Sequence, residues 1–300
     1  MKKKTYLIAL MAMALTLGSC SDNENGIGGE TSKYITVSTS IGNMTRVATD
    51  ANGGQTFEEG DEISVYAWTG DATVAPETRE RVVNNAINKL TNGSWVSTPQ
   101  MLWKNNRDKH YFIGVYPTAA ISDLSAGEYT FDVNKQTESD LLVAVNPDGL
   151  SYSADAQQTV PLTFTHVMAK LAVNLTYKNQ WGGIPTVEKV VVGNAAKEAT
   201  INYLTKVVTP STTAKEDFSL PEITENTKYV SVIIPQEDVK QLTIVIGGKN
   251  FVYDNGTPFK LESGKITTVN LEVGRDEIKL GDVKITNWED GSTFSGEALN

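Results

Sequence analysis

The sequence predicts an all-β protein whose short strands form sandwiches or barrels. Many short runs alternate apolar and polar side chains, which is typical of strands with one buried face. Asn-Gly pairs, which suit tight hairpin turns, occur at 52–53, 92–93 and 255–256. No segment shows a long helical period of apolar residues. We therefore expect strands nearly throughout the chain, with no long helix.

The first predicted strand begins near Tyr34 and ends before a single basic residue, Arg46. Three apolar side chains share one face of this strand, because side chains in a strand alternate; they are Ile35, Val37 and Ile41. We interpret residues 33–46 as a removable strand. An arginine-specific protease would cut between Arg46 and Val47, and the groove left behind would take a strand from another subunit.

The first 19 residues have the pattern of a signal peptide. Three lysines at 2–4 precede an apolar run over 6–17, which is too short to span a bilayer as a helix. The sequence Leu17-Gly18-Ser19-Cys20 that follows resembles a bacterial lipobox. It implies cleavage before Cys20, acylation of that cysteine and an acyl anchor in the membrane. The alternative is an ordinary secretory signal with an incidental cysteine.

Residues 20–32 read as a lipidated, flexible tether rich in Gly, Asn, Glu and Ser. Asp22 and Glu24 look like the surface-export signals of Bacteroidetes lipoproteins. Beyond the tether, predicted strands recur at 63–68, 111–117, 129–133, 141–145, 187–192, 229–234, 242–246, 251–253 and 266–273. A turn is expected at 146–149, where the sequence reads Asn-Pro-Asp-Gly.

The apolar alternation changes phase within 162–175. Leu162, Phe164 and His166 share one face, and the apolar positions from Val167 onward fall on the other. Such a change implies a bulge or a strand that passes from one core to another. We take it as the crossing between an N-terminal domain, 33–160, and a C-terminal domain, 161–300.

The C-terminal tail, 277–300, has the pattern of a donor strand. Its apolar positions change phase after Gly281-Asp282, which fits a strand pair or one strand with a bulge; they are Ile278, Leu280, Val283, Ile285 and Trp288. Such a segment can add to a sheet edge through backbone bonds and alternate side chains. Five buried apolar side chains would contribute about 7–15 kcal/mol before ordering costs. The alternative is that the tail pairs within its own domain.

Composition argues against several kinds of function. The net charge of −10 disfavours nucleic-acid binding, which rests on Lys and Arg at phosphates. A single cysteine excludes an intrachain disulfide, and one cysteine with two histidines argues against a zinc site, so we expect no metal or other cofactor. We expect His110 to be solvated and His166 to be a core or hydrogen-bonded residue. The acids within 58–62 read as a solvated turn, and no catalytic motif points to an enzyme.

Several motifs in this order resemble the fimbrillin, or Mfa-like, lipoproteins of Bacteroidales. They are Thr45-Arg46, the F-x-x-G-D-E-I-x-V-Y sequence over 57–66, G-V-Y-P at 114–117 and L-T-F-x-H-x-x-A-K-L over 162–171. The resemblance implies two tandem transthyretin-like β-sandwich domains and a subunit of a type V pilus. It also implies export as a lipoprotein, cleavage at Arg46 and polymerisation by donor-strand exchange. The family often has Ala after the arginine, where this chain has Val47.

The resemblance further implies a surface-exposed lipoprotein of the outer membrane that enters a fimbrium after processing. Its partners would be other pilin subunits, an arginine-specific protease, the outer membrane and a host or bacterial surface ligand. The alternative is a monomeric, lipid-tethered protein that binds glycans through tryptophans; the candidates are Trp68, Trp95, Trp103, Trp181 and Trp288. The sequence does not distinguish a stalk, tip or anchor role.

Overall fold

The computed structural model describes residues 33–42, 57–153, 158–254 and 256–288. Within them the chain forms nineteen strands, one short α-helix, α1 (Gln136–Ser139), and two 3₁₀ turns, which confirms the all-β prediction. The signal peptide, the tether with Cys20, the processing site Arg46–Val47 and residues 289–300 lie outside the described residues. No helix of the described part is both long and apolar enough to cross a membrane.

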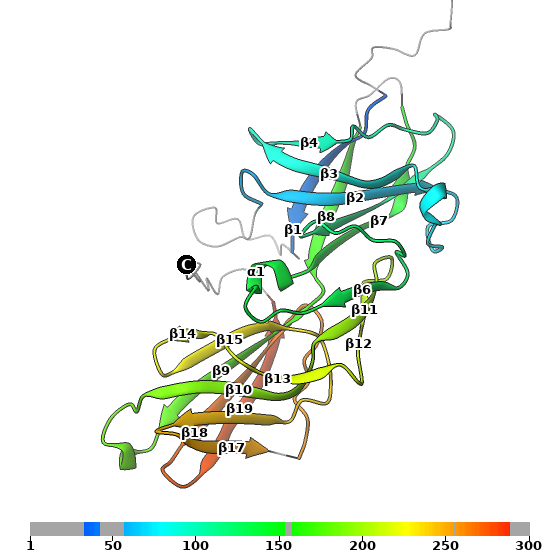
Figure 1. Cartoon of the computed structure of the whole chain (residues 1–300). Coiled ribbons are helices and arrows are strands. Elements are labelled where there is room, and N and C mark those ends of the chain that lie inside the picture. Colours follow the sequence, from blue (N-terminus) through cyan, green and yellow to red (C-terminus); the bar gives the residue numbers. More distant parts are fainter. Residues whose placement is uncertain (1–32, 43–56, 154–157, 255, 289–300) are drawn as a thin grey trace, which may run out of the picture.

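A seven-stranded sheet forms the N-terminal part of the molecule (Figure 1). Its order is β1-β8-β7-β5-β2-β3-β4. The strands are β1 (Thr36–Ile41), β8 (Thr159–His166), β7 (Leu142–Leu150), β5 (His110–Tyr116), β2 (Glu62–Thr69), β3 (Val83–Thr91) and β4 (Ser94–Thr98). β1 runs parallel to β8, whereas the other neighbours in this sheet are antiparallel.

Two turn predictions in this sheet have different outcomes. Asn92 and Gly93 join β3 to β4 with φ angles of 51° and 72°, as a two-residue hairpin requires. The turn predicted at 146–149 is wrong, because these residues lie inside β7. The register slips there, since Phe112 pairs with Asn146 and His110 with Leu150. The Asn-Pro-Asp-Gly sequence therefore makes a bulge, and the chain does not reverse.

Two further sheets form the C-terminal part. One has the order β13-β10-β16-β17 and the other β14-β15-β9-β18-β19. Their strands are β13 (Lys215–Ser219), β10 (Val187–Ala196), β16 (Gln241–Ile246), β17 (Lys249–Asp254), β14 (Glu222–Thr224), β15 (Lys228–Ile233), β9 (Ala169–Tyr177), β18 (Lys265–Val273) and β19 (Ile278–Asn287). Apolar residues of both sheets, such as Val192, Ile244, Leu171 and Val269, share one buried core. This is the arrangement of a β-sandwich.

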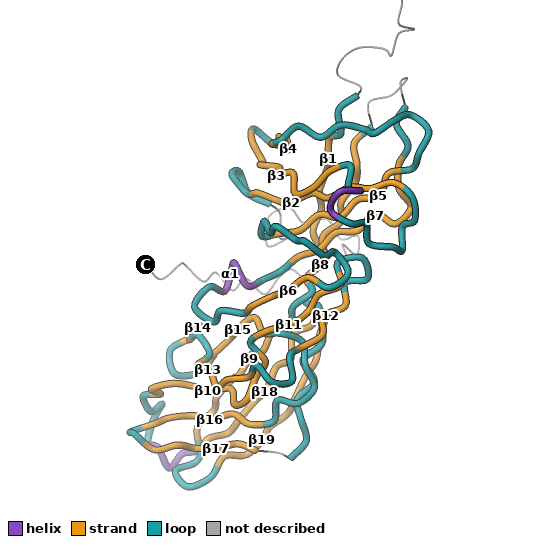
Figure 2. The backbone as a smooth tube through the Cα atoms, turned by 45° about the vertical axis from the view of Figure 1, so that its right-hand side comes forward, coloured by secondary structure: helices purple, strands orange, loops and turns teal. Residues whose placement is uncertain are grey.

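The chain passes between the sheets where the phase change predicted it. β8 ends at His166 in the seven-stranded sheet, and β9 begins at Ala169 in the five-stranded one. A third, three-stranded sheet spans the two parts: β6 (Gly127–Thr130) pairs with β11 (Glu198–Asn202), which pairs with β12 (Val207–Pro210). Figure 2 shows these strands between the two larger bodies. Since β6 precedes residue 160 but pairs beyond it, the division into 33–160 and 161–300 stays a prediction.

Candidate functional site

The first strand, β1, is an integral part of the N-terminal core. Ile35, Val37 and Ile41 are 2%, 6% and 8% exposed. They belong to the apolar cluster that includes Leu162 and Phe164 of β8. Each buried side chain of this size contributes about 1.5–3 kcal/mol, so the three together contribute roughly 5–9 kcal/mol. The predicted groove-filling face is therefore buried, as the alternation indicated.

β1 lies at the edge of its sheet and covers β8. The parallel register pairs Val37 with Val160 and Ile41 with Phe164. On the outward face, Ser40 Oγ donates to Thr163 Oγ1 at 3.2 Å. After β1, the backbone N–H of Gly42 donates to the Phe164 carbonyl at 2.9 Å. If β1 were removed, two surfaces would be exposed together: the edge of β8, and the apolar groove that holds Ile35, Val37 and Ile41, here called the seat of β1.

The opposite side of β1 touches the far end of the same sheet. Ile35 N–H donates to the Met101 carbonyl at 3.0 Å, and Tyr34 forms an isolated bridge with Leu102. Trp95 Nε1 of β4 donates to Thr39 Oγ1 at 3.0 Å. The sheet therefore curves until β4 and the segment after it lie beside β1. Sequence reasoning missed these partners, because nothing local links residues about sixty positions apart.

Aromatic side chains fill the floor beneath β1. The ring of Phe164 lies 5.1 Å from that of Phe57, which also contacts Trp95 and Tyr116 at 5.3 Å, all near edge-to-face. Gly114 of β5 makes room for Phe164, since a Cβ at this glycine would lie 2.6 Å from Phe164 Cζ. A larger residue at 114 would displace the Phe164 ring, which belongs to the same apolar cluster as Ile41. The G-V-Y-P sequence thus has a packing reason for its glycine.

The tail forms β19, which pairs with β18 of its own chain at the edge of the five-stranded sheet. The register shifts at Gly281, which confirms one strand with a bulge. Because of this shift, the four donor-strand candidates that lie within β19 all pair with buried residues of β18. The pairs are Ile278 with Val273, Leu280 with Leu271, Val283 with Val269 and Ile285 with Thr267. Val283 and Ile285 are nevertheless 39% exposed each. Half of this apolar face is therefore incompletely covered.

Trp288, the last donor candidate, is buried at the junction between the two parts of the molecule. Its indole stacks on His166 with a centroid distance of 4.0 Å and an interplanar angle of 5°. Lys170 Nζ lies 4.0 Å from the centre of the same ring. His166 Nδ1 in turn is 2.8 Å from Asp140 Oδ1. His166 is therefore a buried, hydrogen-bonded histidine, as the sequence predicted.

The expectation that His110 is solvated is wrong. Its side chain is fully buried, and its Nε2 accepts a hydrogen bond from the Lys104 N–H at 3.0 Å. Burial lowers the pKa of His110, although the Asp108 carbonyl, 3.1 Å from Nδ1, opposes this shift. The imidazole is thus held neutral, with one nitrogen as acceptor and the other as donor. It orders the loop before β5.

The acids over 58–62 organise a turn. Asp61 Oδ2 accepts from the Glu58 N–H at 2.7 Å, and Glu59 Oε1 accepts from the Asn92 N–H at 2.7 Å. Glu62 pairs with Lys89 at 2.9 Å on the surface. Among the described residues no group of three or more His, Cys, Asp or Glu side chains is placed to hold a metal ion.

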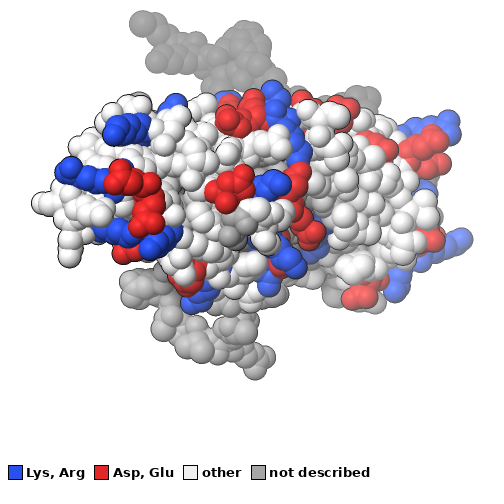
Figure 3. All heavy atoms as spheres, turned by 90° about the horizontal axis from the view of Figure 1, so that it is seen from below, with Lys and Arg blue, Asp and Glu red and all other residues white. Residues whose placement is uncertain are grey.

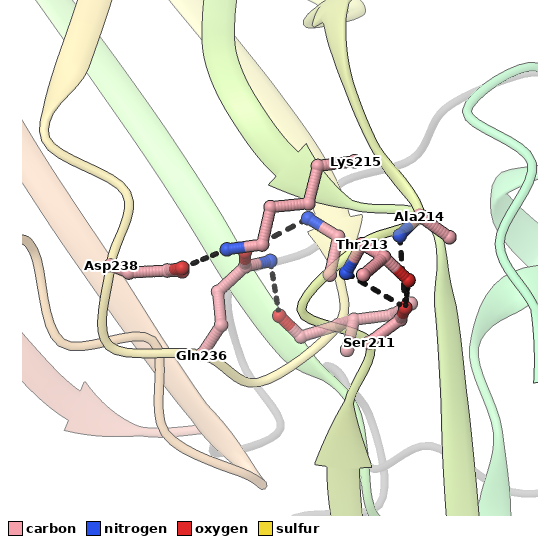
Figure 4. A network of polar contacts seen from close by, with 8 residues as sticks. Ser211, Thr213, Ala214, Lys215, Gln236 and Asp238 are labelled. Carbon is pink, nitrogen blue, oxygen red and sulfur yellow. Dashed lines mark hydrogen bonds and ion pairs between the residues drawn. The ribbon is translucent and has the colours of Figure 1, made fainter.

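A second polar network joins strands of the C-terminal sandwich (Figure 4). Lys215 of β13 pairs with Asp238, and Gln236 Oε1 accepts from the Ala196 N–H at 2.9 Å. Ser211 Oγ accepts from the Ala214 N–H at 2.9 Å and shapes the preceding loop. Each group here is satisfied by a structural partner, and the network presents no nucleophile beside a base. Its role is to hold β13 against β10 and the segment after β15.

The tryptophans do not form an exposed platform in the described structure. Trp68 and Trp288 are buried, and Trp95, Trp103 and Trp181 are partly buried. Trp103 packs edge-on against His110 and Phe112, with centroids 5.0 and 5.8 Å away.

On the face in Figure 3, acidic and basic side chains are interspersed. That face therefore carries no continuous basic surface of the kind that phosphate backbones require.

Comparisons with known proteins agree on one family. A family model described as fimbrillin-like matches residues 45–288. A protein of Bacteroides uniformis with the provisional name fimbrium subunit Fim1C is 24% identical over 315 aligned positions, which cover 97% of each chain. The similarity therefore extends over nearly the whole sequence.

Solved structures share the fold at low sequence identity. A protein of Bacteroides ovatus, provisionally described as a cell adhesion protein, superposes with a TM-score of 0.62 at 18% identity, covering 86% of this chain and 98% of that one. Another from B. uniformis, described likewise, gives 0.60 at 20% identity and covers 78% and 94%. A fimbrial protein of Bacteroides vulgatus gives 0.52 at 13% identity and covers 85% and 99%.

Proposed function

Because this chain belongs to the fimbrillin-like family, we propose that it is a structural subunit of a cell-surface fimbria of the type V pilus kind, and no enzyme. The observation that carries the proposal is β1, a short edge strand whose apolar face fills the core. Such a strand is at once necessary to the closed subunit and replaceable by a similar strand from a neighbour. The chemistry-bearing side chains described above are occupied in structural roles, which fits a scaffold.

The proposal includes the route by which the subunit reaches the surface. The chain is exported as a lipoprotein, acylated at Cys20 and held at the outer membrane. An arginine-specific protease then cuts between Arg46 and Val47. Three residues separate Gly42, the last described residue after β1, from Arg46. A cut there would leave β1 attached to the seven-stranded sheet only through non-covalent contacts.

The tail supplies the replacement strand in this scheme. β19 is an edge strand, and its Val283 and Ile285 are incompletely covered in the closed chain. Moving into the vacated seat of a neighbour would bury them more fully. Each strand so exchanged joins two subunits, and repetition of the step builds a polymer that supports adhesion to a host or bacterial surface ligand.

A limited digest of the chain from residue 21 onward tests the proposal. An arginine-specific protease should cut first after Arg46, and the cut protein should form ladders that resist mild heating in detergent. Arg46→Ala should remain uncut and monomeric. Val283→Asp and Ile285→Asp should be cut normally but form no ladders, because a carboxylate cannot enter an apolar seat. Polymerisation of the uncut Arg46→Ala chain at the normal rate would remove the proposal.

The alternative is a lipid-tethered monomer that binds glycans. The described tryptophans are buried or partly buried, which disfavours it, and the same digest separates the two functions. The N-terminal residue of protein recovered from cells is equally decisive: Val47 marks a processed subunit, and acylated Cys20 marks a retained lipoprotein.

A further inference from the structure

Trp288 is the one buried residue in the last described stretch of the tail. Residues 281–287 are exposed, and Trp288 itself is only 9% exposed. Its backbone N–H donates to the Gly264 carbonyl at 2.9 Å, and the Gly264 N–H donates to the Met168 carbonyl at 2.8 Å. The exposed end of β19 is therefore followed by a single well-anchored side chain.

The ring of Trp288 contacts His166 and Lys170, which lie at the junction of the two parts and outside β18, the strand with which β19 pairs. His166 is the last residue of β8, and Lys170 lies in β9. Burial lowers the pKa of Lys170, an effect that Asp140 opposes. An ammonium group so removed from water gains more from an aromatic face than an exposed one does. The indole thus interacts with a flat, buried imidazole and with a desolvated cation.

The same strand, β8, holds both the first strand and the end of the tail. Ile41 pairs with Phe164, and the Gly42 N–H donates to the Phe164 carbonyl. His166, two residues further along β8, stacks against Trp288. β1 therefore orders the end of β8 next to His166, the residue that Trp288 of the tail contacts. If β1 leaves, one edge of β8 loses its partner just before His166.

We propose that the contacts of Trp288 with His166 and Lys170, here called the clasp, hold the tail against its own chain. We propose further that β1, while it is paired with β8, preserves the clasp by ordering the end of β8. The clasp is an autoinhibitory contact: the tail is retained until the first strand is displaced. What the released tail then does rests on the proposed function; the clasp itself is a property of the single chain.

Hydrogen exchange on the monomeric chain from residue 21 onward tests the clasp without any assembly. Trp288→Ala should accelerate exchange of the β19 amides by about tenfold or more. The matched control is Ile285→Ala, an apolar truncation in the same strand at a side chain that is 39% exposed, and it should change β19 exchange by no more than about threefold. Amides of β2 and β5 report whether the fold is intact.

Milder variants keep the test decisive if Trp288→Ala unfolds the chain. Lys170→Met removes the cation and keeps the length of the side chain, and His166→Phe keeps an aromatic face. Lys170→Met should accelerate β19 exchange, and His166→Phe should do so less than His166→Ala. Unchanged β19 exchange in Trp288→Ala, or in Lys170→Met if the first variant unfolds, would overturn the clasp.

A second arm tests the link to β1. Ile41→Ser weakens the seating of β1, and Ser40→Thr is its control on the outward face. Ile41→Ser should accelerate β19 exchange in the otherwise wild-type chain and have little further effect in Trp288→Ala. Equal β19 exchange in Ile41→Ser and wild type would overturn the link. If the tail is freed as expected but cut protein forms no ladders, the clasp stands and strand exchange fails.

Discussion

Trp95 donates a hydrogen bond from Nε1 to Thr39 Oγ1 at 3.0 Å, although their strands, β4 and β1, stand at opposite ends of the seven-stranded order. Together with the Tyr34–Leu102 bridge, this bond gives β1 contacts on both sides. β1 is therefore retained by more than its pairing with β8.

Removing this bond should weaken the seat of β1 measurably. Thr39→Val keeps the shape of the side chain and removes the acceptor, so the free energy of unfolding should fall by about 1 kcal/mol. Urea denaturation of Thr39→Val, Trp95→Phe and the double variant gives the coupling between the two side chains. A coupling energy near zero would show that the bond does not help to hold β1.

The inward face of β1 should tolerate no charge. Val37→Asp would bury a carboxylate in the apolar cluster, and we expect it to lower the free energy of unfolding by at least about 3 kcal/mol or to release β1. Ser38→Asp, one residue away on the exposed face, should change it by no more than about 0.5 kcal/mol. Thermal unfolding of both variants measures the contrast, and similar stability for the two would refute the assigned orientation.

Gly114 should be sensitive to a single methyl group. A Cβ at this position would lie 2.6 Å from Phe164 Cζ, so Gly114→Ala should cost about 1–3 kcal/mol of stability through overpacking. Gly114→Ala combined with Phe164→Leu should recover part of that loss, because the smaller side chain leaves the space. A double variant whose stability is lower than the summed effects of Gly114→Ala and Phe164→Leu predict would contradict this account.

His110 should make stability depend on pH. Burial lowers its pKa in the folded chain, whereas the unfolded chain has the ordinary value of about 6.5. Below that pH the unfolded state binds more protons, so the free energy of unfolding should fall as the pH drops from 7 toward 5, by at most about 1.4 kcal/mol per pH unit. Comparing wild type with His110→Gln isolates this contribution, since other groups titrate in both. Identical pH profiles would contradict a neutral, buried His110.

Alternation predicted the parts of this fold that depend on one strand at a time. It identified the buried face of β1 and the phase change between β8 and β9, because each follows from which side chains need a core. For the tail it left a strand pair or one bulged strand as alternatives, and the structure shows one strand with its bulge at Gly281. The Asn92-Gly93 hairpin was predictable from backbone preference alone.

Long-range pairing was not predictable in the same way. Nothing near Thr39 indicates Trp95, and nothing near Trp288 indicates His166, since these pairs depend on how sheets curve and stack. His110 was misjudged because its polar neighbours in sequence lie in a loop that folds over it. The bulge at 146–149 was mistaken for a turn because the same residue types serve both.

The central claim is that a neighbour's tail occupies the seat that β1 leaves. The most direct measurement is cross-linking mass spectrometry on ladders assembled from a mixture of ¹⁴N- and ¹⁵N-labelled cut chains, with a reagent that joins lysines. The account predicts mixed-isotope links from the tail lysines Lys279 and Lys284 to lysines of the seven-stranded sheet and its loops, such as Lys89 and Lys104. Ladders whose tail lysines link only within one chain, as the closed β18–β19 pair would give, would contradict it.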